Sequence, residues 1–105
     1  MALTRDFKKT VQARVQRDPK FRESLITAAG CLLAGDVETG KTILRDYINA
    51  TVGFEKLGAA MHKSPKSLMR MFGEKGNPQA QNLFSVLGYI QKKEKIKLAV
   101  HPEPA

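Results

Sequence analysis

Basic and polar side chains between residues 63 and 77 have the spacing of one helical face. Lys66 and Arg70 are four residues apart, so on a helix they lie side by side, whereas Leu68 and Phe72 fall on the opposite side. A lysine can neutralise one phosphate, and an arginine can also bind a guanine edge through two hydrogen bonds. The pattern therefore predicts a helix with one docked apolar face and one free cationic face.

The candidate DNA-contacting residues are the polar residues of this helix and its flanks: Lys63, Ser64, Lys66, Ser67, Arg70, Lys75 and Asn77. Ser64 precedes a proline, so its first expected role is to cap the helix, and Ser67 either donates to a phosphate or supports that cap. Met69 either contacts a thymine methyl group or packs as an adaptable apolar side chain. The alternative for the whole face is a solvated surface that binds nothing.

Two short predicted helices surround this site. The chain reads as a helix over 54–61, three or four linking residues, and a basic helix over 65–72, which is typical of a helix-turn-helix. Asn77 and a following proline predict the start of a last helix over 78–91. Its apolar residues recur at helical spacing: Leu83, Val86, Leu87 and Ile90.

Three further helices are predicted upstream, over 4–17, from residue 19 to Gly35, and from Asp36 to Gly53. Their apolar residues recur with helical spacing: Phe7, Val11 and Val15 in the first, Phe21, Leu25, Ala28, Ala29 and Leu32 in the second, and Val37, Leu44, Tyr47, Ile48 and Thr51 in the third. Three helices are more than DNA binding requires. They either form a surface for a protein partner, through Phe7, Val11, Phe21 and Leu25, or enlarge the core.

The C-terminal segment changes period. Ile96, Leu98 and Val100 alternate with polar or small residues, which predicts a short β-strand over 94–101. A lone strand in a helical chain either pairs with a second subunit, pairs with another protein, or lies against the helices.

Residues 35–42 match the phosphate-loop pattern G-x-x-x-x-G-K-[ST], but the context does not fit that chemistry. The motif needs a strand before the loop, and the preceding residues have helical periodicity. We therefore interpret the segment as a turn between helices, in which Asp36 caps the next helix and Lys41 is solvated.

Composition limits the remaining possibilities. The 105 residues carry 18 Lys plus Arg against 10 Asp plus Glu, a net charge of +8 that favours an anionic partner. The length suits one domain, and no apolar run is long enough for a membrane span or a signal peptide, so we expect a cytoplasmic protein without a membrane partner. Cys31 is the only cysteine, and no spacing suggests a catalytic, metal or cofactor site. We expect no enzymatic activity.

Residues 52–87 resemble a Cro/repressor-type helix-turn-helix in the stretch V-G-F-E-K-L-G-A-A-M-H-K-S-P-K-S-L-M-R-M-F-G-E-K-G-N-P-Q-A-Q-N-L-F-S-V-L. From Asp18 through the I-K-L-A-V-H tail, about four fifths of the chain, the sequence is similar to the HigA-like addiction-module antidote proteins, or antitoxins. The segments R-D-Y-I-N-A-T-V-G-F-E-K-L, S-P-K-S-L-M-R-M and G-N-P carry this resemblance.

The resemblance implies a DNA-binding antitoxin that neutralises a RelE/ParE-like toxin by direct binding and represses its own operon, commonly as a homodimer on double-stranded operator DNA. By position, it places Ser64, Lys66, Ser67 and Arg70 on the recognition helix. This chain departs from the pattern where repressors often place glutamines: Phe54 replaces a phosphate-binding one and Pro65 a base-reading one.

The expected fold is a mainly α bundle of five to six helices with one short C-terminal strand. It forms a single domain over 1–105, with N-terminal helices in 1–52, a helix-turn-helix core in 53–91 and the strand in 94–101. The alternative function is a stand-alone helix-turn-helix regulator or a protein-interaction module with no toxin partner.

Overall fold

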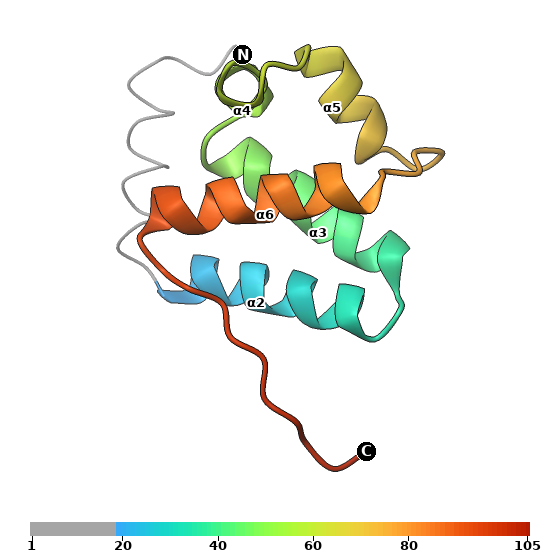
Figure 1. The fold of residues 1–105 in the computed structure, drawn as a ribbon, viewed down its shortest axis with the longest axis vertical. Coiled ribbons are helices and arrows are strands. Elements are labelled where there is room, and N and C mark those ends of the chain that lie inside the picture. The colour runs from blue at the N-terminus through green and yellow to red at the C-terminus, as the bar shows by residue number, and fades with distance from the viewer. Residues whose placement is uncertain (1–18) are drawn as a thin grey trace.

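A computed structural model describes residues 19–105, with side chains from residue 22 onward, and this part of the chain forms five α-helices (Figure 1). The helix predicted over 4–17, with Phe7 and Val11, lies outside the described residues, as does the side chain of Phe21. The mainly helical class predicted from the sequence is confirmed. None of the described helices is long and apolar enough to cross a membrane.

Helices α2 (Pro19–Leu33) and α3 (Val37–Ala50) pack against each other across a three-residue turn. Asp36 caps α3 as predicted, since its carboxylate accepts a hydrogen bond from the backbone N–H of Thr39 at 3.3 Å. The predicted apolar faces are buried at Leu25 and Ala28 in α2, at Leu44, Tyr47 and Ile48 in α3, and at Thr51 just after the end of α3. Ala29 and Leu32, which were also predicted to be buried, are half-buried, and Val37, the first residue of α3, is 41% exposed.

Helices α4 (Phe54–Met61) and α5 (Pro65–Met71) form the pair predicted as a helix-turn-helix, and α4 ends at His62 in the left-handed conformation. The turn lies against Gly58, where a Cβ atom would be 2.5 Å from the carbonyl oxygen of Lys63. Only glycine permits so close an approach of the backbone. The rings of Phe54 and Phe72 then join the two helices, with centroids 6.1 Å apart.

Helix α6 (Ala80–Glu94) crosses the bundle and contributes Leu83, Val86, Leu87 and Ile90 to the core, as predicted (Figure 1). It begins two residues later and ends three residues later than the predicted 78–91. The extra residues carry Glu94 inward, where it is 7% exposed, and the helix ends only at Lys95, which has a left-handed backbone. Tertiary packing therefore decides where α6 ends.

The strand predicted over 94–101 is not formed in the described chain. Residues after Lys95 run as an irregular tail that leaves the bundle beside α2 (Figure 1). The backbone N–H of Leu98 donates to the side-chain oxygen of Gln91 at 2.8 Å, and Ile96 and Leu98 pack against the core. Only the start of the tail lies against helices, and Val100 is 77% exposed. Within residues 19–105 the tail has no neighbouring strand edge, so the alternating pattern gives partial burial of Ile96 and Leu98 without a β-ladder.

Candidate nucleic-acid interface

Helix α5 has the two faces that its sequence predicts. Leu68 is 0% exposed and Phe72, which ends the helix, is 1% exposed, so this side is docked in the core. On the other side Lys66, Ser67 and Arg70 are exposed. Because the apolar face of α5 is buried in the core, the cationic side chains on the opposite face point to solvent.

Ser64 caps α5 as predicted, with its hydroxyl oxygen accepting from the backbone N–H of Ser67 at 3.1 Å. The Ser64 hydroxyl also donates to the Ser67 hydroxyl at 2.9 Å. Pro65 follows at the first helical position, where its missing N–H costs no hydrogen bond. Both serines thus support the start of the helix, and Ser67 remains exposed at the cationic face.

The other candidate residues lie on both sides of the helix. Lys63 is half-buried in the turn before α5, and Lys75 and Asn77 are exposed in the loop that leads to α6. Met69 is 48% exposed, so it is not a core residue of the described chain and shares the outer surface with Arg70. Lys75 and Asn77 follow α5 directly, so the loop and the cationic helix adjoin in the chain.

Lys41 departs from its predicted solvated state. Its side chain is 1% exposed, and its ammonium donates to the carbonyl oxygens of Gly73 at 3.1 Å and Gly76 at 2.6 Å. A carboxylate oxygen of Glu38 lies 3.0 Å from the same nitrogen. Since an ammonium has three N–H donors, these three acceptors can satisfy a buried charge completely. Sequence reasoning missed this residue because its loop partners are 32 and 35 positions away.

The loop that Lys41 contacts is a tight turn at the end of α5. The backbone N–H of Gly73 donates to Arg70 O at 3.1 Å, and that of Gly76 donates to Gly73 O at 3.0 Å. A Cβ atom at Gly76 would lie 2.2 Å from Arg70 O, so glycine is required there. Glu74 and Lys75 occupy the exposed corner of this turn.

One departure from the repressor pattern has a structural explanation. Phe54, where repressors often have a phosphate-binding glutamine, is 4% exposed and stacks obliquely on Phe72. It cannot contact DNA, and instead it holds α4 and α5 together.

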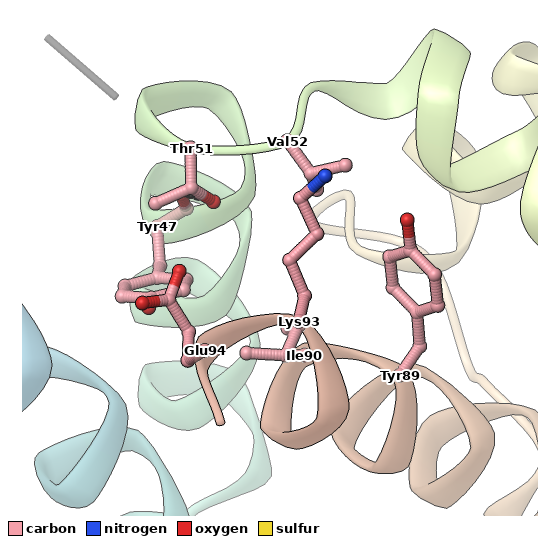
Figure 2. Close-up of a pocket in the computed structure, with 7 residues that line it drawn as sticks. All are labelled: Tyr47, Thr51, Val52, Tyr89, Ile90, Lys93 and Glu94. Carbon is pink, nitrogen blue, oxygen red and sulfur yellow. Dashed lines mark hydrogen bonds between the residues drawn. The ribbon is translucent and has the colours of Figure 1, made fainter. Parts of the chain in front are cut away.

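A separate small pocket lies between the C-terminal parts of α3 and α6 (Figure 2). Its volume of about 80 Å³ is below the 300–1,000 Å³ of usual small-molecule sites. The Glu94 carboxylate lies next to the Tyr47 ring, and burial together with that carboxylate raises the pKa of the Tyr47 hydroxyl. The hydroxyl therefore stays protonated well above neutral pH, and the pair is better suited to helix packing than to acid–base chemistry.

Among the described residues, no cluster of three or more His, Cys, Asp or Glu side chains could hold a metal ion. No protein-family model, curated protein or solved structure matches the chain. Because these comparisons suggest no function, the functional proposal rests on the geometry of α4, α5 and the loop after α5.

Proposed function

We propose that this protein binds double-stranded operator DNA through α5 and acts as a homodimeric repressor and antitoxin. The observation that carries the DNA-binding proposal is the division of α5 into a buried face and an exposed face that bears Lys66 and Arg70. A short capped helix that follows a tight turn can insert its free face into a major groove. Arg70 is the residue proposed to read a base, and the lysines bind phosphates.

The charge distribution supports the same partner. Between Lys56 and Lys97 there are nine basic residues and two acidic ones, Glu74 and Glu94. Glu94 is buried on α6, which leaves Glu74 as the exposed acid of that segment. The positive field of such a segment attracts DNA from a distance, whereas the phosphate contacts are proposed for α5 and the loop after it.

The antitoxin part of the proposal rests on the sequence resemblance to HigA-like antidote proteins. It assigns the protein a RelE/ParE-like toxin as partner and autorepression as its regulatory role. Homodimer formation also follows from physical considerations, because one short recognition helix reads only a few base pairs and specific sites are commonly bound as two half-sites.

The proposal is tested by light scattering coupled to size-exclusion chromatography. The protein is run alone and with the DNA fragment immediately upstream of its own reading frame, against a scrambled fragment of equal length and composition. We expect a dimer that shifts the upstream fragment selectively. A monomer that leaves both fragments unshifted would overturn the DNA-binding proposal.

A matched pair of double variants separates the α5 face from net charge. Lys66→Gln with Arg70→Gln should abolish the selective shift. Lys95→Gln with Lys97→Gln, which removes the same charge from exposed residues at the end of α6 and in the tail, should retain it. Equal losses in the two variants would indicate attraction by net charge alone. The toxin part is tested separately, by co-purification with a RelE/ParE-like protein from an adjacent reading frame and by relief of its growth inhibition.

A protein-interaction module with no toxin partner is the second candidate. Exposed apolar side chains on α2 and at the start of α3 favour it, namely Ile26 at 58%, Leu33 at 67% and Val37 at 41%. Such side chains are suited to burial against another protein. This candidate becomes the leading one if the protein does not bind the upstream DNA fragment.

A further inference from the structure

We infer that Lys41 is a positioning residue for DNA binding, which holds the loop after the recognition helix so that Lys75 faces the same DNA as α5. This inference rests on the proposed DNA-binding function. The side chain of Lys41 is 1% exposed although it ends in an ammonium group. A lysine is rarely buried unless specific partners compensate for its lost hydration.

The ammonium nitrogen of Lys41 has three acceptor oxygens within 3.1 Å. Two are carbonyl oxygens of the loop, Gly73 O at 3.1 Å and Gly76 O at 2.6 Å, and the third is the Glu38 carboxylate one helical turn away at 3.0 Å. Glu38 is 66% exposed, so the loop carbonyls are the partners inside the protein. The ammonium thus connects α3 to both ends of the turn that carries Lys75.

Two carbonyls held by one cation fix the turn at both ends. Gly73 O also accepts from the N–H of Gly76, so Lys41 adds to a turn that already closes on itself. Gly76 fits under the end of α5 only because it has no Cβ. The exposed Lys75 therefore projects from a turn whose two ends are tied to α3, so the backbone that carries it does not need to be ordered when DNA binds.

Lys41→Met tests this inference, because methionine keeps the buried aliphatic volume and removes the three donors. Affinity is measured by fluorescence anisotropy on the upstream fragment. We expect about a five- to tenfold loss and a salt slope less steep by about one for each chain, the same change as Lys75→Ala. Lys97→Met, which removes an exposed tail charge, is the matched control and should change affinity by less than about twofold.

A double-mutant cycle separates positioning from general stability. If Lys41 acts through Lys75, adding Lys41→Met to Lys75→Ala should lower affinity by less than about twofold further. A full five- to tenfold additional loss would overturn the inference, since Lys41 would then act independently of Lys75.

Two glycine variants probe the same turn while Lys41 itself is kept. Gly76→Ala should reproduce the affinity loss, because its Cβ meets Arg70 O, whereas Gly73→Ala should be tolerated, since its Cβ has its nearest neighbours at 3.4 Å. Amide exchange of residues 73–77 gives a reading without DNA: Lys41→Met should accelerate it while the amides of α2 and α3 are unchanged. If Lys41→Met accelerates exchange but the protein does not bind DNA, the proposed function is refuted and the attachment of the loop by Lys41 is not. If exchange is unchanged, the attachment of the loop is itself refuted.

Discussion

Substitution of Leu68 by alanine should test directly which face of α5 is docked. Leu68 is 0% exposed and lies in the hydrophobic core together with Phe54, Leu57 and Phe72. The substitution removes about three carbon groups, whose transfer out of water stabilises the fold by about 2.4 kcal/mol. The cavity left behind adds to this loss, so we expect the free energy of unfolding to fall by about 3–4 kcal/mol in total.

Urea unfolding followed by far-UV circular dichroism measures this change. With a slope of about 1–3 kcal/mol per molar urea, a loss of that size lowers the transition midpoint by about 2 M. A domain of this size has a total stability of about 5–15 kcal/mol, so the variant should remain mostly folded in water at 25 °C. The folded baseline therefore remains measurable.

Met69→Ala is the matched control, since Met69 is the next residue on the same helix and is 48% exposed. Its stability should change by at most about 0.5 kcal/mol. If Met69→Ala destabilised the protein as much as Leu68→Ala, the assignment of the two faces of α5 would be wrong. The proposed DNA-contacting surface would then lose its structural basis.

Four further outcomes are expected. Ser64→Ala removes the α5 cap and should lower the free energy of unfolding by about 1 kcal/mol in urea titrations, and no loss would show that the cap is dispensable. Arg70→Ala should weaken binding to the upstream fragment more than Lys75→Ala in anisotropy assays, and equal losses on upstream and random DNA would contradict base reading. For six to eight phosphates neutralised by a dimer, the logarithm of the binding constant should fall with the logarithm of salt concentration with a slope of about −5 to −7, whereas a slope near zero would exclude phosphate contacts as the source of affinity. Above about pH 10, the unfolded state loses the Tyr47 proton while the folded state retains it, so stability should fall as pH rises, and Tyr47→Phe should reduce that fall in pH-dependent urea titrations.

Local features of the sequence were enough to predict α5 and its two faces. Ser64 and Pro65 set the start of the helix through contacts within four residues, and the helical period of Leu68 and Phe72 identifies the docked side. The cap of α3 by Asp36 is local in the same way. Such features can be read from the sequence because each depends on neighbours along the chain.

Tertiary structure decided the features whose partners are distant in sequence. Lys41 was predicted to be solvated because its neighbours suggest a surface turn, yet the fold brings it to carbonyls more than 30 residues away. Likewise, Glu94 extends α6 into what was predicted to be a strand, because it is buried near Tyr47 on α3. In both cases an ordinary charged residue takes its role from the packing of helices, and no local period or cap predicts that packing.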